Sequence, residues 1–239
     1  MKQYKSILFD LDDTLIDNDE SMKHAIFEIY DKLGIPCNEE TFSYWKKYDI
    51  DYWVDWENGL VKIPEWASSQ HMRIDYLRTY RFISFFKNFD ISYEEAVKMN
   101  RLYSTLLSKN VVPIDGALDL VENLSGKYEL IISTNGDKDA AFAKLKAIDL
   151  YPHFSKIIAS GECGYSKPMP GFYHYTISRM KNRDRHKMLI IGDSLKTDVL
   201  GGVINGIDTC WFNPLKKENT LGIEPTYEVH YLKQLTKKL

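Results

Sequence analysis

The chain has few cysteines and no long apolar run. Its three cysteines, Cys37, Cys163 and Cys210, lie far apart in 239 residues, which argues against a disulfide framework and fits a reducing compartment. The six histidines do not cluster, so a zinc site is not expected. No apolar run approaches the roughly 18 residues of a membrane helix, and no signal-peptide pattern is present. We therefore expect a cytoplasmic protein without a membrane partner.

The chain also lacks a basic segment that could bind a polyanion. It has 31 basic and 34 acidic residues, a net charge of −3 and an isoelectric point near 6.1. Because nucleic-acid binders carry a basic patch or stripe, no nucleic-acid partner is expected. The hydrophobic content of 44% is enough for one sizeable core and a smaller second unit.

Strand-like and helix-like segments alternate from Pro113 onward. Short apolar runs occupy residues 128–133, 156–159, 188–191 and 209–212, and helix-like segments lie at 138–148, 171–180 and 195–204. This alternation predicts a parallel sheet with helices on both faces. The apolar run Ser6–Phe9 reads as a first strand of the same sheet. The predicted fold is therefore α/β, with a doubly wound, Rossmann-like parallel-sheet core.

The segment between the first strand and Pro113 has a helical pattern. Apolar residues recur at helical spacing from Met22 to Leu33, and Gly34 and Pro36 end that run. Pro64 is predicted to open the next long helix. Ser92 and Glu95 form a capping-box pattern before another helix, so residues 17–112 read as an all-helical insertion. Residues 1–16 and 113–239 then form the core around it.

Two carboxylates follow the first strand at a spacing of two residues. Asp10 and Asp12 can leave the same face of the chain as the strand ends, and Asp13 and Thr14 come next. One carboxylate can attack phosphorus while the other moves a proton, as metal-assisted phosphate hydrolysis requires. Short acidic segments also form solvated turns and helix caps, so this pair alone does not establish an active site.

Further polar residues stand at or near the ends of the later strands. Thr134 and Asn135 follow one apolar run, Lys167 lies in a loop with a proline, and Asp193 follows another run, with Asp198 after it. Since open parallel sheets bind ligands beyond the carboxyl ends of their strands, these residues are predicted to form one site with the first acidic pair.

This ordered set resembles the motifs of the haloacid-dehalogenase superfamily of phosphohydrolases. Asp10 and Asp12 match the first motif, Thr134 the second, Lys167 the third, and Asp193 with Asp198 the fourth. The resemblance implies that the core binds a small phosphomonoester and that the helical insertion is a cap, which could close over the site as a lid.

The resemblance also implies roles for these residues. Asp10 is the candidate nucleophile, with a non-covalent metal ligand as the alternative, and Asp12 is the candidate general acid and base. Thr134, Asn135 and Lys167 are expected to hold the transferring phosphoryl group.

The implied cofactor is Mg²⁺, held by the carboxylates of Asp10 and Asp193 and by the backbone carbonyl of Asp12. For Asp198 two interpretations are open. It orients a water or Lys167 from a second layer around the metal, or it only caps the helix that follows.

A weaker resemblance points to one branch of the superfamily, the pyrimidine 5′-nucleotidases. It depends on the segment 52–60, on the tail 213–227, and on Asp13 where many relatives have glycine. It implies nucleoside 5′-monophosphates as substrates. Trp53 and Trp56 could then stack on a nucleobase or simply pack a helical core, and Asn18 lies near the presumed hinge.

The predicted function is magnesium-dependent hydrolysis of phosphomonoesters through an aspartyl-phosphate intermediate. Two alternatives are open: a sugar-phosphate phosphatase or phosphomutase of the same superfamily, and a binding protein that kept the fold without the chemistry. A dehalogenase is disfavoured because Asp12 supplies an acid that true dehalogenases lack at this position.

Overall fold

The computed structural model describes residues 3–239, which divide into two compact units. One unit extends to Asp19 and resumes over Val111–Leu239, and the other is Glu20–Asn110. The chain therefore inserts the second unit into the first. The two connecting segments pair as a short antiparallel ribbon of β2 (Ile16–Asp17) and β3 (Val112–Pro113). The domain boundaries in the sequence analysis, and the roles of core and cap, stay predictions.

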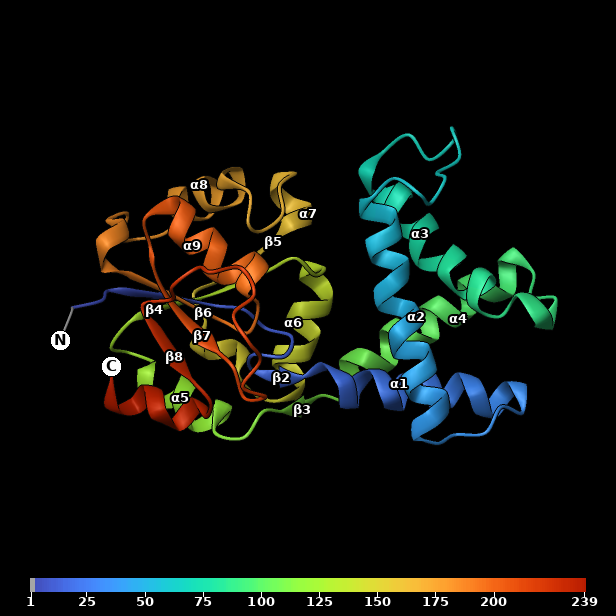
Figure 1. The fold of residues 1–239 in the computed structure, drawn as a ribbon, viewed down its shortest axis with the longest axis horizontal. Coiled ribbons are helices and arrows are strands. Elements are labelled where there is room, and N and C mark those ends of the chain that lie inside the picture. Colours follow the sequence, from blue (N-terminus) through green and yellow to red (C-terminus); the bar gives the residue numbers. More distant parts are fainter. Residues whose placement is uncertain (1–2) are drawn as a thin grey trace. The chain divides into compact units, whose positions relative to one another are not determined.

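Six parallel strands form the sheet of the first unit, in the order β5-β4-β1-β6-β7-β8 (Figure 1). The strands are β1 (Ser6–Phe9), β4 (Glu129–Thr134), β5 (Lys156–Ala159), β6 (Met188–Gly192), β7 (Asp208–Phe212) and β8 (Tyr227–Val229). In register, Ser6 of the central strand β1 lies opposite both Glu129 and Met188. The predicted α/β fold with a parallel sheet is confirmed.

Helices cover both faces of this sheet, which explains why its central strands are apolar along their whole length. Ile7 and Phe9 pack on one face with residues of α5 (Ala117–Leu124) and α6 (Lys138–Ala147). Leu8 packs on the other face with residues of α8 (Pro170–Ser178). Figure 1 shows α5 on one side of the sheet and α8 and α9 (Leu200–Asn205) on the other.

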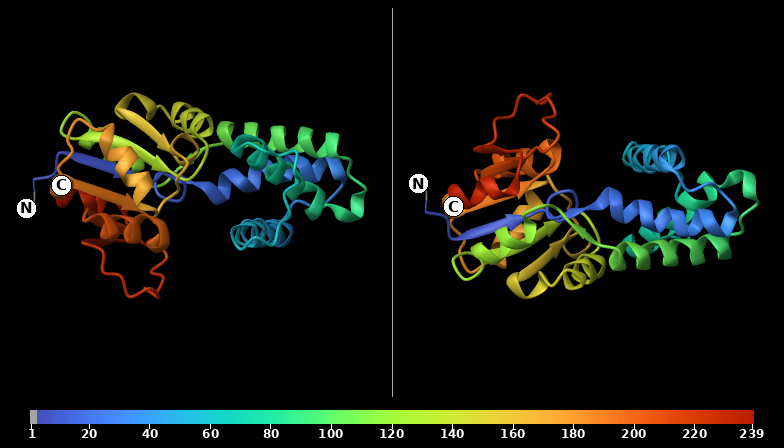
Figure 2. Two further views of the ribbon diagram at one scale, coloured as in Figure 1. Left: turned by 90° about the horizontal axis from the view of Figure 1, so that it is seen from above. Right: turned by 90° about the horizontal axis from the view of Figure 1, so that it is seen from below.

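The second unit consists of helices and loops (Figure 2). Its long helices are α1 (Asn18–Leu33), α2 (Glu39–Glu57), α3 (Gln70–Phe85) and α4 (Tyr93–Lys109). An aromatic cluster fills its interior, where Trp45 packs against Phe82 and Tyr103. The Arg81 guanidinium lies among these rings and pairs with Asp49. This unit therefore has a hydrophobic core of its own.

Helix starts within this unit show where the sequence patterns succeed and fail. Ser92 and Glu95 form the predicted capping box of α4. Pro64 does not open α3, which begins at Gln70. The Pro64 carbonyl instead accepts the Ala67 amide in a turn that precedes the helix. Ser69 caps α3, accepting the Met72 amide at 3.2 Å. The Pro64 prediction was wrong because a proline also suits the turn before a helix.

No helix in the described part of the chain combines the length and the apolar character needed to cross a bilayer.

Candidate active site

Three neighbouring strands end in residues that the sequence analysis selected. Asp10 directly follows β1, Thr134 is the last residue of β4, and Asp193 directly follows β6. Strand β1 lies between β4 and β6, and all three are parallel. These residues therefore start from one edge of the sheet, where open parallel sheets bind ligands.

Lys167 joins this edge from the loop before α8. Its ammonium lies 2.6 Å from Asp10 Oδ1, 2.7 Å from Asp198 Oδ1 and 2.8 Å from the Ser133 carbonyl oxygen. These three acceptors match the three donors of an ammonium group. Burial alone would lower the pKa of Lys167, but the carboxylates of Asp10 and Asp198 outweigh it and raise the pKa. The side chain is therefore a fixed positive charge beside Asp10.

Asp198 holds Lys167 and is almost completely buried, with 1% of its surface exposed. Its second oxygen accepts the Ser194 amide at 3.3 Å. The side chain that caps the following π-helical turn, Leu195–Val199, belongs to Ser194, which accepts the Thr197 amide. The geometry thus favours the interpretation in which Asp198 orients Lys167.

Gly192, the last residue of β6, makes room for that aspartate. A Cβ atom at this position would lie 2.3 Å from Asp198 Cγ. Real Cβ atoms do not approach other atoms so closely, so the β6 strand end passes Asp198 only because residue 192 is glycine.

Thr14 connects the first and last of the motif loops. Its buried hydroxyl lies 3.4 Å from Asp10 Oδ2 and accepts the Asp193 amide at 3.0 Å. The preceding residue, Asp13, has a φ of 59°, a left-handed conformation that Asp tolerates better than most residues. The turn that follows Asp10 therefore returns a hydroxyl to the same carboxylate.

Three carboxylates form an acidic group around this point. Asp10, Asp193 and Asp198 each offer an oxygen, and these oxygens lie within 4.8 Å of one another. Lys167 brings one positive charge, which leaves an excess of negative charge when all three are ionised. An all-oxygen donor set of this kind fits a hard divalent cation such as Mg²⁺. Lys167 contacts one oxygen of Asp10 and one of Asp198, and the carboxylates that the sequence predicts to hold the cation are those of Asp10 and Asp193.

The environment of Asp193 shows the electrostatic cost of this arrangement. Burial, followed by the nearby carboxylates of Asp198 and Asp13, raises the pKa of Asp193 to about 7. The Trp211 indole donates to the Asp193 carbonyl oxygen at 2.8 Å and fixes the backbone. A bound cation would offset the repulsion from the neighbouring carboxylates, which adds to the effect of burial on this pKa.

Thr134 and Asn135 end β4 beside the same carboxylates. Thr134 is buried, and its hydroxyl accepts the Gly136 amide at 2.9 Å. The Asn135 side chain bonds the backbone of Lys167 twice, accepting from its amide at 2.7 Å and donating to its carbonyl oxygen at 3.1 Å. Asn135 therefore positions the loop that carries Lys167.

Asp12 stands at the more open side of the site, with 34% of its side chain exposed. Its Oδ1 lies 2.6 Å from the ammonium of Lys144, a residue of α6. Its Oδ2 lies on the side of Gly136, where an added Cβ would be 3.9 Å from Oδ2 and 3.1 Å from Thr134 Oγ1. Asp12 and Thr134 thus border the same space.

The comparisons with known proteins agree with this architecture. Residues 4–204 match the family described as haloacid dehalogenase-like hydrolase. The chain belongs to the haloacid dehalogenase-like hydrolases. The match runs from before β1 to Ile204 in α9, so it includes every strand end described above.

Individual members of this hydrolase family match almost the whole chain. The HAD-hydrolase YfnB of Bacillus subtilis is 32% identical over 235 residues, which are 98% of this chain and 95% of YfnB. Its crystal structure bound to magnesium gives a TM-score of 0.85 at 31% identity, covering 100% of this chain and 99% of that one.

Two other members carry names that state a substrate class. The pyrimidine 5′-nucleotidase PynA of Streptococcus pneumoniae is 30% identical, covering 97% of this chain and 93% of PynA. The pyrimidine 5′-nucleotidase YjjG of Escherichia coli is 28% identical, covering 98% of this chain and 96% of YjjG.

Some residues around this hydrolase site were not selected from the sequence. Thr14, Lys144 and Trp211 each contact a motif residue. Thr14 lies inside the first motif, so its hydroxyl was a visible signal. Nothing in the pattern around Lys144 or Trp211 distinguishes them from a surface lysine or a core aromatic.

The remaining predicted residues lie elsewhere. Asn18 begins α1, and its amide donates to Asp13 Oδ1 at 3.2 Å. Trp53 and Trp56 belong to α2 in the helical unit, both half-buried, with ring centroids 5.8 Å apart in an edge-to-face arrangement. Their contact with a substrate stays a prediction.

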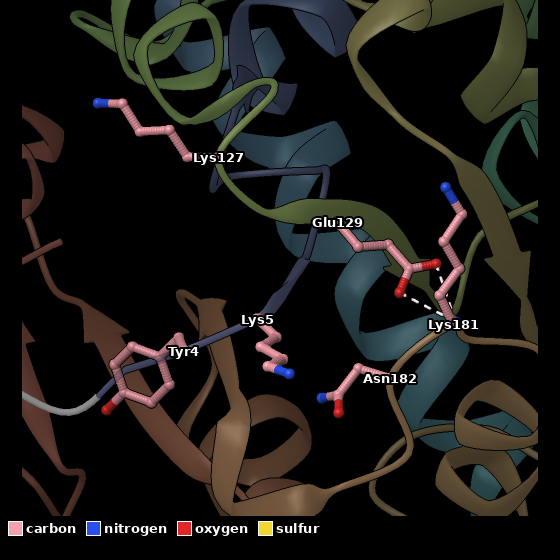
Figure 3. Close-up of a pocket in the computed structure, with 6 residues that line it drawn as sticks. All are labelled: Tyr4, Lys5, Lys127, Glu129, Lys181 and Asn182. Atoms are coloured by element: carbon pink, nitrogen blue, oxygen red, sulfur yellow. Dashed lines mark hydrogen bonds between the residues drawn. The ribbon is translucent and has the colours of Figure 1, made fainter.

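A polar hollow lies near the amino ends of the strands, at the edge opposite the motif residues. Its lining is Tyr4, Lys5, Lys127, Glu129, Lys181 and Asn182 (Figure 3). The three lysine side chains point in different directions, and the Glu129 carboxylate accepts the Lys181 amide. The hollow therefore offers no converging set of donors for an anion.

Proposed function

We propose that this chain is a magnesium-dependent phosphomonoester hydrolase that acts on nucleoside 5′-monophosphates. The observation that carries the proposal is the ammonium of Lys167, 2.6 Å from Asp10 at the same strand edge as Thr134 and Asp193. A carboxylate, a hydroxyl and a fixed positive charge around one point suit a transferring phosphoryl group.

Asp10 performs the first step of the proposed reaction. A carboxylate oxygen of Asp10 attacks phosphorus and the bond from phosphorus to the ester oxygen breaks, which gives an acyl phosphate. Asp12 gives its proton to the departing oxygen, so the alcohol leaves neutral. The positive charge of Lys167 attracts the phosphoryl oxygens, and the Thr134 hydroxyl can donate a hydrogen bond to one of them while the charge moves.

Water completes the reaction in a second step. Asp12, now a carboxylate, accepts a proton as the water oxygen attacks phosphorus. The bond between phosphorus and the Asp10 oxygen breaks, which restores both carboxyl groups and releases phosphate. Asp10, Asp193 and the Asp12 carbonyl would hold Mg²⁺, which would reduce the repulsion between the phosphate and these carboxylates.

The substrate class is supported by the relatives and by the sequence pattern. Two full-length relatives, at 28% and 30% identity, are named pyrimidine 5′-nucleotidases. Segment 52–60, which resembles the pyrimidine 5′-nucleotidases, lies in the helical unit. We therefore place the recognition of the nucleoside in that unit.

The activity is tested by phosphate release from an aryl phosphate with and without Mg²⁺. We expect release with Mg²⁺ and loss of that release after chelation with EDTA. A chain that releases no phosphate under either condition would be a binding protein on this fold, and the proposal would be wrong.

The substrate class needs a panel of pyrimidine and purine 5′-monophosphates and hexose phosphates under the same conditions. We expect the highest kcat/KM for the pyrimidine 5′-monophosphates. Preferred hydrolysis of hexose phosphates, or transfer of phosphate between two positions of a sugar, would refute the nucleotide assignment while leaving the core chemistry.

A further inference from the structure

Lys144 is a buried lysine that has no role in the proposed reaction steps. It lies in α6 with 6% of its surface exposed, and its ammonium contacts Asp12 Oδ1 at 2.6 Å. The other lysines of this helix are more open. Lys146 is exposed, and Lys138 forms a surface pair with Glu162 in which 49% of the lysine side chain is accessible.

Burial of a lysine is unfavourable unless its charge is paired. The loss of hydration at Lys144 is offset by a carboxylate from a different strand loop, 132 residues earlier in the chain. An ordinary surface lysine would need no such partner. The pair therefore links the α6 helix to the first motif at the residue that handles the proton.

The contact with Lys144 also places the two carboxylate oxygens of Asp12 in different surroundings. Oδ1 faces Lys144, whereas Oδ2 lies toward Gly136 and the Thr134 hydroxyl. A general acid must sit within hydrogen-bond reach of the oxygen that it protonates. Because Lys144 holds Oδ1 of Asp12, Oδ2 of the same carboxylate points in a fixed direction.

We propose that Lys144 is a positioning residue that holds the Asp12 carboxyl in the orientation needed to protonate the leaving oxygen. This inference rests on the proposed phosphatase function and assigns no contact between Lys144 and the substrate. Its consequence is selective, because only substrates with a poor leaving group depend on that proton.

The test compares an alkyl phosphate, here a nucleoside 5′-monophosphate, with p-nitrophenyl phosphate in the Lys144→Met protein with Mg²⁺. We expect kcat for the alkyl phosphate to fall about 10²-fold, a typical cost of misplacing a catalytic group. The aryl phosphate, whose leaving group needs little protonation, should lose much less, and neither KM should change greatly.

Two further variants separate positioning from folding. Lys144→Arg retains a cation that can reach the carboxylate and should recover most of the alkyl phosphate activity. Lys138→Met removes a lysine from the same helix without touching Asp12 and should behave as the unchanged protein. Thermal melting of each variant reports whether the fold is kept.

A double-mutant cycle gives an answer even when Lys144→Met lowers stability. In an Asp12→Asn background, the loss of Lys144 should cost no further alkyl phosphate activity. Equal losses for both leaving groups, a change in KM alone, or full additivity with Asp12→Asn would overturn the positioning role. If the protein without any substitution hydrolyses neither substrate, the phosphatase function itself is refuted.

Discussion

Single side chains carry the chemistry of this site, and Asp10 has the most specific prediction. Asp10→Asn keeps the size of the side chain but removes the carboxylate that we propose as the nucleophile. We expect phosphate release to fall at least about 10³-fold, as for other catalytic nucleophiles. The measurement is steady-state turnover of p-nitrophenyl phosphate with Mg²⁺.

Asp13→Asn is a matched control for that variant. Asn tolerates the left-handed backbone that Asp13 adopts, and it can still accept the Asn18 amide. The same loss of one negative charge should then reduce activity far less. Similar turnover in Asp10→Asn and Asp13→Asn would contradict the role of Asp10.

Gly192 tests how tightly Asp198 is packed. In Gly192→Ala the new methyl group would meet Asp198 Cγ at 2.3 Å, and the buried aspartate must move away from Lys167. We expect a loss of about 1–3 kcal/mol in the free energy of unfolding, typical of overpacking. A strong fall in kcat should accompany it, because Lys167 loses an acceptor.

Gly161→Ala provides the comparison within the same unit. A Cβ atom there meets no described atom within 4 Å, and the backbone is helical. Its stability and turnover should stay close to those of the unchanged protein. Equal behaviour of the two alanine variants in urea denaturation and in turnover would show that Asp198 is not held by packing.

Helix α6 links two parts of the site, since it begins after the Thr134 loop and carries Lys144. Its N-cap, Asp137, accepts the amides of Asp139 and Ala140, each at 3.0 Å. Asp137→Ala should lower the free energy of unfolding by about 1 kcal/mol, whereas Asp137→Ser, which still caps, should lower it less. Urea midpoints at constant slope measure the difference. An unaltered midpoint in Asp137→Ala would show that this cap contributes little.

The sequence patterns predicted the strands and helices that are determined by residues close together in the chain. The strands of the central sheet are continuous apolar runs because both faces are covered, and the capping box of α4 is complete within four residues. Strand β8 was not predicted, because a three-residue strand after a polar loop is defined only by its pairing with β7. Pro64 misled because the same residue suits a helix start and a turn.

The residues of the site likewise differ in whether the sequence could predict them. Asp10, Lys167 and Asp193 could be selected because each stands at a strand end or in a motif loop. Lys144 and Trp211 could not, since their contacts join residues 132 and 18 positions apart. A sequence pattern records which residue types are present but not which buried lysine meets which carboxylate.

The complete chain should respond to Mg²⁺ even without a substrate. Three carboxylate oxygens lie within 4.8 Å of one another, and the Lys167 ammonium contacts two of these carboxylates. A cation that binds this acidic group only in the folded form stabilises that form by mass action. At a hundredfold excess over Kd this amounts to about 2.7 kcal/mol. For a chain of this size that corresponds to a rise of roughly 5–10 °C in the thermal midpoint.

Asp193→Asn separates this effect from general ionic stabilisation. It removes one carboxylate of the acidic group, whereas Glu122→Gln removes an exposed carboxylate on α5 of the same unit. In calorimetry with and without Mg²⁺, Glu122→Gln should keep the full shift and Asp193→Asn should lose most of it. Because Asp193 also repels its neighbours, Asp193→Asn should melt higher than the unchanged protein when EDTA is present. Equal Mg²⁺ shifts in all three proteins would place the cation elsewhere.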